Sequence, residues 1–241
     1  MLERKPSLTD QAKAHIKQRI LDGEFEDDRI PSESELAAEL GVSRTTIRDA
    51  LSRLQNEGAI YRKQGSGTYV NRAGLQIKTR LEEMWSYESV LTAHGYTPSV
   101  RILRVEREPA GEEVGNELRM DAEDELVTVE KLFLEDDEPV ILTINQVPEY
   151  LVRGSIPDEQ WRAPIFEFLL EHCRQRLSYY LSEIVPVSAS SELAGVLQVE
   201  AGKALISFAE VGFNDENVPI LKTMSYFRDD LLRLRLIRRQ V

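Results

Sequence analysis

The residues whose chemistry is most readily named lie in the segment RTTIR at residues 44–48. The guanidinium groups of Arg44 and Arg48 can each bind O6 and N7 of guanine with two hydrogen bonds. A threonine side chain can contact a phosphate or the methyl group of thymine, so Thr45 and Thr46 suit the same kind of surface. The plainer alternative is a solvated helix face, and the predicted elements around the segment favour the first interpretation.

Two predicted helices flank the tight turn Gly41-Val42-Ser43. Ser32 and Glu35 have the spacing of a capping box and open the first helix, which ends at Gly41. Ser43 can cap the second helix, whose apolar positions follow helical spacing. These positions are Ile47, Ala50, Leu51 and Leu54. Two short helices joined by a glycine-containing turn are typical of a helix-turn-helix, which places the start of its second helix at base edges in the major groove.

Two further elements complete this module. An amphipathic helix is predicted to end near Asp22-Gly23 and to serve packing. Its apolar stripe consists of Leu8, Ala12, Ile16 and Ile20, extended by Leu21 and Phe25. Residues 59–70 predict two short strands around a Gly-Ser-Gly tip, and Gly65 in this tip lets the backbone approach a groove or phosphate. Taken alone, the tip is more typical of an ordinary hairpin turn, but together the elements predict a winged helix-turn-helix.

Length and composition limit the number of domains and the class of protein. At 241 residues, with 41% hydrophobic and 30% charged residues, the chain predicts two globular domains. It has no apolar run long enough for a spanning helix and no apolar signal segment at its start, so we expect a cytoplasmic protein with no membrane partner. The single cysteine, Cys173, lies in an apolar helix-like stretch and is interpreted as a buried, unreactive thiol.

The net charge of −12 argues against a nucleic-acid partner until its distribution is considered. Residues 1–78 hold 13 basic and 12 acidic residues, whereas residues 79–241 hold 17 and 30. Residues 43–72 contain six basic residues against Asp49 and Glu57, which is a local footprint suited to DNA. The acidic half would discourage promiscuous binding.

The second half contains an internal repeat. A polar linker from Asn71 to Arg80 precedes a predicted helix over 81–94, and a shift of 79 residues then aligns Leu118 with Leu197 and Leu126 with Leu205. Each copy reads as a strand, a short helix and a hairpin. The hairpins are predicted at 125–147, with a turn over residues 136–139, and at 204–227, with a turn over residues 214–218. The fold class is therefore α+β, with an antiparallel sheet flanked by helices.

Three motifs in the first seventy residues resemble the GntR family of bacterial regulators: IKQRILDGEF, RIPSESELAAELGVSRTTIRDALSRLQNEG and GSGTYV. From the family, recognition-helix contacts to DNA are implied for Arg44, Thr45, Thr46 and Arg48, and a wing contact for Gly65. The family commonly has arginine between the two glutamates of the P-S-E-x-E segment, where this chain has Ser34. That departure bears on affinity and base preference, and leaves the predicted fold unchanged.

The segments REPAGEEVGNELRM, VEKLFLEDDEPVIL and YFRDD resemble the UTRA domain of the HutC-type branch of this family, whose fold is similar to chorismate lyase. The resemblance implies a pocket for a small-molecule effector. Relatives tend to have two arginines and two glutamates where this chain has Lys131, Phe133, Thr143 and Leu221, which favours an effector that is less polar than a sugar phosphate. The effector-binding candidates are Lys131, Phe133, Thr143, Asn145, Tyr226 and Arg228, with solvated strand positions as the alternative.

These observations predict a DNA-binding domain over 1–72, a linker over 73–80 and an effector-binding and dimerisation domain over 81–241. The expected protein is a homodimeric, metabolite-controlled transcription regulator, with repression as its expected mode, that binds operator DNA and needs no cofactor. A dimer that binds DNA without a ligand stays open as an alternative. An enzyme is disfavoured because His15, His94 and His172 are scattered without metal-ligand spacing, and no catalytic motif is found.

Overall fold

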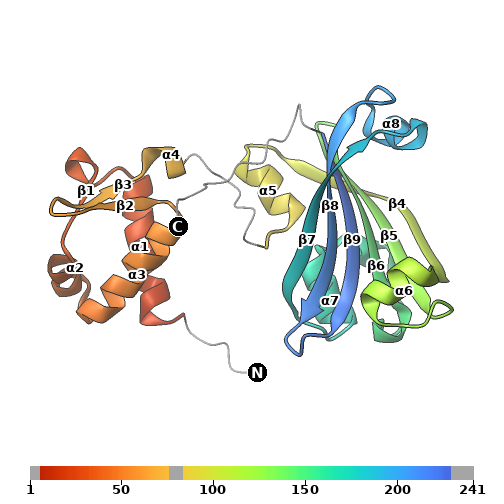
Figure 1. The fold of residues 1–241 in the computed structure, drawn as a ribbon, viewed down its shortest axis with the longest axis horizontal. Coiled ribbons are helices and arrows are strands. Elements are labelled where there is room, and N and C mark those ends of the chain that lie inside the picture. The colour runs from red at the N-terminus through yellow and green to blue at the C-terminus, as the bar shows by residue number, and fades with distance from the viewer. Residues whose placement is uncertain (1–5, 76–83, 229–241) are drawn as a thin grey trace. The chain divides into compact units, whose positions relative to one another are not determined.

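The computed structural model describes residues 6–75 and 84–228, which fall into two compact units (Figure 1). The first unit is built from the described residues up to Leu75. The second begins with the described residues at Met84 and contains a large sheet. No helix within the described ranges is long and apolar enough to cross a membrane.

Three helices and a short 3-10 turn form the body of the first unit. They are α1 (Leu8–Leu21), the turn Glu26–Asp28, α2 (Glu33–Leu40) and α3 (Arg44–Asn56). The predicted stripe on α1 is confirmed at Ala12, Ile16 and Ile20, and Phe25 is also buried. Leu8 and Leu21 are 60% and 59% exposed, so their inclusion in that stripe was wrong. They are the first and last residues of α1, where the apolar stripe runs out into solvent.

The predicted helix boundaries around the turn are confirmed. Ser32 and Glu35 form the full capping box, with the Ser32 amide donating to the Glu35 carboxylate at 2.8 Å. Gly41 ends α2 with a φ of +63°, a left-handed conformation that glycine adopts without steric cost. The Ser43 hydroxyl then accepts from the Thr46 amide at 3.1 Å and caps α3, whose four predicted apolar residues are all buried.

A small antiparallel sheet forms the wing of this unit. Strands β2 (Ile60–Lys63) and β3 (Gly67–Val70) make the predicted hairpin, and β1 (Arg29–Ile30) pairs on the other side of β3. The chain then continues as α4 (Arg72–Leu75), where a linker was predicted. The segment is not an exposed linker because Gly74 lets it pack closely on the first unit. Gly74 is buried, and a Cβ there would lie 1.9 Å from the Gly58 carbonyl oxygen. Residues 76–80 of the predicted linker lie outside the described residues.

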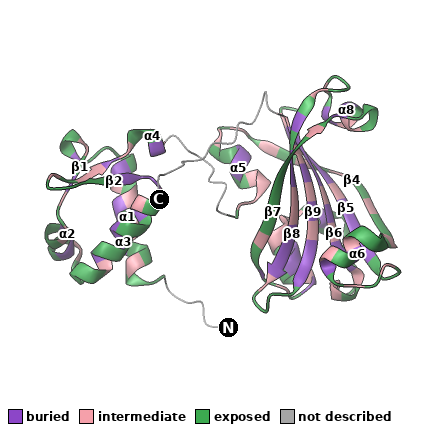
Figure 2. Ribbon diagram, in the orientation of Figure 1, coloured by how far each residue is buried: buried purple, intermediate pink, exposed green. Residues whose placement is uncertain are grey.

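The second unit is a six-stranded antiparallel sheet in the order β4-β5-β6-β9-β8-β7, as the predicted α+β class requires (Figure 1). Its strands are β4 (Pro98–Pro109), β5 (Glu125–Glu135), β6 (Glu138–Pro148), β7 (Leu177–Ser188), β8 (Ala204–Asn214) and β9 (Pro219–Phe227). The four inner strands are largely buried and the two edge strands largely exposed (Figure 2). The accompanying helices are α5 (Tyr87–Ala93), α6 (Gly111–Leu118), α7 (Ile165–His172) and α8 (Ser191–Leu197), with 3-10 turns at Glu149–Leu151 and Asp158–Arg162.

The internal repeat is confirmed as β4-α6-β5-β6 followed by β7-α8-β8-β9. Equivalent backbone hydrogen bonds recur: the Met120 amide donates to the Gly115 carbonyl and the Val199 amide to the Ala194 carbonyl. The copies meet at the central pair β6–β9. Each copy's helix also packs on a strand of the other copy, because α6 contacts β9 and α8 contacts β6.

Two predictions about this unit were wrong in detail. The helix predicted over 81–94 begins only at Tyr87, where the Ser86 hydroxyl caps it, and residues 81–83 lie outside the described residues. The first hairpin turns on Asp136-Asp137 alone, both with positive φ, so β6 already begins at Glu138. Cys173, at the end of α7, is buried as predicted, and burial raises the pKa of its thiol to about 11.

Candidate DNA-binding surface and ligand cavity

The first turns of α3 present the predicted DNA-binding residues to solvent. Arg44, Thr45 and Arg48 are exposed. The hydroxyl of Thr46 instead contacts the Ser43 hydroxyl at 2.8 Å, so it also steadies the helix start. The side chains of Arg44, Arg48 and Thr45 can therefore contact base edges or phosphates without first leaving a buried position.

Glu33 connects the recognition helix to the wing. Its carboxylate accepts from Arg48 Nε at 3.2 Å and lies 3.6 Å from Arg62 Nη2 on β2. The three side chains come from α2, α3 and the wing, so this ion-pair group orients two cations on one surface. Sequence reasoning counted Arg62 among the basic residues of the DNA footprint over 43–72, but it assigned no role to Glu33. The acidic residue in the first turn of α2, next to Ser34, was the available signal.

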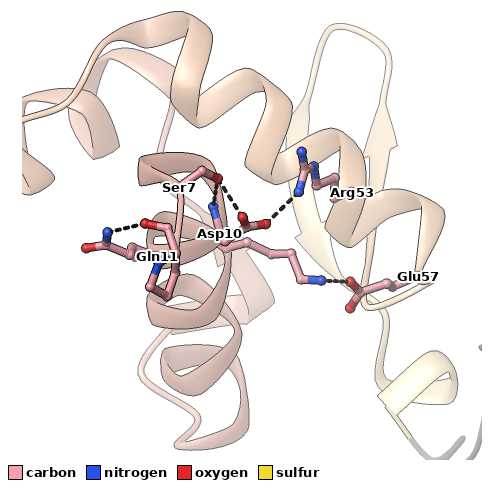
Figure 3. A network of polar contacts seen from close by, with 7 residues as sticks. Ser7, Asp10, Gln11, Arg53 and Glu57 are labelled. Atoms are coloured by element: carbon pink, nitrogen blue, oxygen red, sulfur yellow. Dashed lines mark hydrogen bonds and ion pairs between the residues drawn. The ribbon is translucent and has the colours of Figure 1, made fainter. Parts of the chain in front are cut away.

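A second polar network fastens α3 to α1 at the opposite end of the helix (Figure 3). Arg53 donates to Asp10 at 2.6 Å, and Lys13 and Lys17 both bind the Glu57 carboxylate. Burial opposes ionisation of Glu57, yet hydrogen bonds from the two lysines hold its pKa below the ordinary value. The C-terminal end of α3 is thus fixed while its N-terminal end stays exposed.

The wing tip has the geometry that a close backbone approach requires. Gly65 has a φ of +71°, and no atom of the described residues lies within 4 Å of a Cβ built on it. Behind the tip, the rings of Tyr61 and Tyr69 stack at 5.7 Å across the two strands, and Tyr69 donates to the Ser66 carbonyl at 3.2 Å. The strand pair is therefore stiffened while the tip itself remains bare.

A cavity of about 290 Å³ lies on one face of the six-stranded sheet, in the second unit. Strand register builds its floor, because Lys131 on β5, Thr143 on β6 and Phe208 on β8 belong to one row of paired residues. Ser225 on β9 completes this row but does not line the cavity. The α5 segment and residues 164–166 supply further lining. Its volume is near the lower end of the range for small-molecule sites, so it suits a compact ligand.

The structure brings Lys131, Phe133, Thr143 and Asn145 together as lining of this cavity. Tyr226 and Arg228 are not among its lining residues, so the structure does not bring them together with the other four candidates. Side chains alternate along a strand, and Tyr226 points to the opposite face of β9, where it packs beside Leu142. Arg228 follows the end of β9, and its guanidinium donates to the Pro139 carbonyl at 3.1 Å.

Lys131 is the one basic side chain among the described residues of the lining. It is 3% exposed, and its ammonium group donates to the Ala163 carbonyl at 2.5 Å. Burial lowers its pKa to about 8, partly offset by the charge of Glu88, so it is still largely cationic at neutral pH. Among the described residues only the Ala163 carbonyl accepts from it, which leaves two of its three N–H donors to meet a ligand.

Glu210, on β8, faces the same cavity and was missed by sequence reasoning. Its carboxylate accepts from the Ser182 hydroxyl at 2.5 Å, and burial raises its pKa above the ordinary value. The internal repeat carried a usable signal, because the 79-residue shift that aligns the two copies takes position 131 to position 210. A polar residue at one of these positions makes its counterpart a candidate.

Hydrogen bonds among the lining residues, and one from the lining residue Tyr87 to Ser225, order the floor. Asn145 donates to the Thr143 hydroxyl at 3.1 Å and accepts from the Thr223 hydroxyl at 3.1 Å. Tyr87 reaches down from α5 to the Ser225 hydroxyl at 2.6 Å, with its ring edge-on to Phe133 at 5.4 Å. The floor is thus a preformed polar surface beneath aromatic walls, which is the usual composition of a small-molecule site.

Both units match known protein families. The family model "Bacterial regulatory proteins, gntR family" matches residues 8–70, and the UTRA domain model matches residues 93–233. The HTH-type transcriptional repressor NagR of Bacillus subtilis is 25% identical over 91% of this chain and 90% of its own. The mannosyl-D-glycerate transport/metabolism system repressor MngR of Escherichia coli is 25% identical, with 82% of each chain covered.

Solved structures share the fold. The possible transcriptional regulator YydK of Bacillus subtilis has a TM-score of 0.76 at 16% identity, covering 97% of this chain and 100% of that one. PhnF of Mycobacterium smegmatis has a TM-score of 0.59 at 21% identity, covering 95% and 99%. Because the UTRA model spans more than half of the chain and the GntR model spans the module before it, this chain belongs to the GntR family of DNA-binding transcription regulators, in the group that carries a UTRA domain.

Proposed function

We propose that this protein is a repressor that binds a palindromic operator as a homodimer and releases it when a small metabolite occupies the cavity of the second unit. The observation that carries the proposal is the combination of an exposed recognition helix and wing in one unit with a preformed cavity in the other. The repressor names of NagR and MngR support the direction of control.

Homodimerisation follows from the size of the reading surface. One short helix with two exposed arginines contacts only a few base pairs, and a two-fold pair of such helices doubles the site. Half-sites one helical turn apart, about 34 to 36 Å, are the default spacing for this motif. The partner is therefore expected to be double-stranded DNA with an inverted repeat.

Metabolite control requires the ligand to bind the DNA-competent and DNA-incompetent arrangements with different affinity. Such coupling typically amounts to about 1 to 3 kcal/mol, or roughly a five- to 150-fold change in operator affinity. The cavity favours this proposal over a dimer without a ligand, because a buried lysine and an ordered polar floor give a ligand specific contacts. We expect a ligand with more apolar surface than a sugar phosphate, with one polar end at Lys131.

The test starts from operator selection with the full chain on random duplex DNA. We expect an inverted-repeat consensus, and light scattering should show two chains per operator. Metabolites that raise the melting temperature of the protein are then added to the complex, and operator release is followed by fluorescence anisotropy. A monomer on DNA would contradict the dimer, and stabilising ligands that leave operator affinity unchanged would contradict the coupling.

A further inference from the structure

Lys131 and Glu210 occupy equivalent positions in the two copies of the repeat. The sheet register confirms the equivalence, because Lys131 on β5 pairs with Thr143 on β6, and Glu210 on β8 pairs with Thr223 on β9. The two threonines are themselves equivalent once the extra residue in the second hairpin is counted. The cavity therefore takes its lining from both copies of the repeat. The first copy contributes an amine, and the second contributes a carboxyl group at the equivalent position.

The central strands between these two groups carry small neutral polar side chains. Across β6 and β9, Thr143 pairs with Ser225, and Asn145 pairs with Thr223. Each of these four residues is at most 4% exposed, and Asn145 bonds to both threonines. Of these four, Thr143, Asn145 and Thr223 line the cavity, so its floor offers neutral hydrogen-bonding groups, while full charge is confined to its two sides.

The charge of the lining argues against a strongly anionic ligand. Among the described lining residues, Lys131 is the only basic side chain, whereas Glu88 and Glu210 are acidic. A phosphate monoester carries nearly two negative charges at neutral pH and is usually held by several donors or an arginine fork. Here one ammonium group, already bonded to the Ala163 carbonyl, would face that charge in the presence of two carboxyl groups.

Aromatic side chains enclose the space above the floor. Trp85 and Tyr87 come from the α5 segment, with their rings 5.7 Å apart, and Trp85 lies 6.4 Å from Phe208 on β8. Phe133 and Phe166 extend the apolar lining toward the Lys131 side. Flat or apolar groups fit such walls, because ring faces and edges contact them without requiring hydrogen bonds.

We propose that the effector is a compact amphoteric molecule, with a carboxylate bound at Lys131, a basic nitrogen bound at Glu210 and Ser182, and a flat or apolar body between them. This proposal rests on the proposed function, because it specifies the ligand of the same cavity. The opposite charges at equivalent positions allow one orientation of the ligand, and a dicarboxylate or a diamine would place like charges together at one end.

A matched panel of ligands tests the proposal on the full chain. Three frames, a benzene ring, a cyclohexane ring and a linear chain, each carry a carboxylate and an aminomethyl group together, either group alone, or a phosphate. Isothermal titration should show that the member with both groups binds at least tenfold more tightly than either singly charged member on at least one frame. Tightest binding by the phosphates, or no binding by any amphoteric member at millimolar concentration, would overturn the proposal.

Two variants of similar size show which residue binds each charged group of the ligand. Glu210→Gln keeps the oxygen that accepts from Ser182, and should weaken amine-bearing members about tenfold while leaving the carboxylate-only member within twofold. Lys131→Met should do the reverse. Glu130→Gln, the neighbour on β5 that faces away from the cavity, is the matched control and should change neither. Equal losses for all members in Glu210→Gln would overturn the assignment of the basic nitrogen.

Failure of this proposal differs from failure of the proposed function. An amphoteric ligand that binds with the predicted variant pattern but leaves operator affinity unchanged supports the ligand class and contradicts the repressor coupling. A phosphate ligand that releases the operator, with no effect of Glu210→Gln, contradicts the ligand class and supports the coupling. Tryptophan fluorescence controls for folding, because both tryptophans of the chain, Trp85 and Trp161, belong to the second unit.

Discussion

The two arginines of the recognition helix differ in how they are held. Arg48 is oriented by Glu33, whereas Arg44 begins the helix and is exposed. We predict that Arg44→Ala and Arg48→Ala each weaken specific operator binding by about 1 to 3 kcal/mol, because each removes a charge-assisted contact to bases or phosphates. Anisotropy titrations on wild-type and mismatched operators measure the loss and any relaxed base preference.

Arg53→Ala is the control for this pair, because the residue lies on the same helix but binds Asp10 at the end fastened to α1. It should leave operator affinity nearly unchanged. If both N-terminal variants kept wild-type affinity across a salt series, the assignment of α3 as the recognition helix would be wrong.

Ser34 is a site where affinity can be raised. It is exposed in the first turn of α2, beside Glu33 and hence beside the surface that carries Arg48. We predict that Ser34→Arg strengthens operator binding and steepens its salt dependence by about one unit of log–log slope, because the added guanidinium can neutralise a phosphate. Ser34→Gln, a polar side chain without charge, should have no such slope change, and an equal gain in both variants would contradict the electrostatic explanation.

Lys131 should make the stability of the second unit depend on pH. Its pKa is about 8 in the folded protein, against an ordinary value of 10.5 for a lysine side chain. Between these values the unfolded chain binds more protons than the folded one, so the contribution of this residue to the free energy of unfolding rises with pH. Relative to Lys131→Met, the wild type should gain stability from about pH 8 to about pH 10.5 in urea unfolding followed by tryptophan fluorescence. Parallel pH profiles for the two proteins would show that burial does not shift the pKa of this lysine.

At the scale of elements, α4 depends on the absence of a side chain at Gly74. A Cβ there meets the Gly58 carbonyl oxygen at 1.9 Å, and backbone atoms cannot yield as a flexible side chain would. We predict that Gly74→Ala costs about 1 to 3 kcal/mol, the usual range for overpacking. Urea unfolding followed by circular dichroism measures the loss in the first unit.

Gly195→Ala is the matched substitution, because this glycine lies in α8 and no atom in the described part of the chain is within 4 Å of its added Cβ. Alanine is favoured over glycine in a helix interior by about 0.5–1 kcal/mol, so this variant should be neutral or slightly more stable. A stable Gly74→Ala variant would mean that α4 can leave Gly58 at little cost.

Elements with strong local signals could be predicted from the sequence. Around α2 and α3, the caps at Ser32 and Ser43 and the glycine at position 41 each act within a few residues, so the boundaries followed directly. The start of α5 has a local cap as well, at Ser86, but its position in the fold depends on long-range contacts. Tyr87 bonds to Ser225, 138 positions later in the chain, and no local period contains that information.

The candidate cavity also combines residues that local signals predict with residues that only long-range contacts identify. Lys131, Phe133, Thr143 and Asn145 could be placed together because they lie on the two strands of one predicted hairpin. Which residues of the distant strand β9 lie on the same face depends on how β9 pairs with β6. An assumed register that is wrong by one residue places Tyr226 on that face instead of Ser225. Glu210 required the register of four strands, and only the repeat offered a route to it.

At the scale of the whole molecule, charge is divided between the two units. The chain carries a net charge of −12, yet the excess of acid lies beyond residue 78. We predict that operator affinity falls steeply with added salt, as for a basic protein, because local cations on α3 and the wing release counterions from DNA. A Lys63→Ala change on the exposed wing strand should reduce the magnitude of the log–log slope by about one. An affinity that is flat between about 50 and 200 mM salt would contradict this account.

The exchange of helices between the two copies of the repeat has a consequence for how the second unit folds. Because α6 covers β9 and α8 covers β6, neither copy can bury its own apolar face before the other has formed. Nucleation must therefore join segments that are distant in sequence, which makes for slow folding and a single cooperative transition. We expect the β6–β9 ladder, where the two copies meet, to open last, so its amides should be the slowest of this unit to exchange with deuterated water.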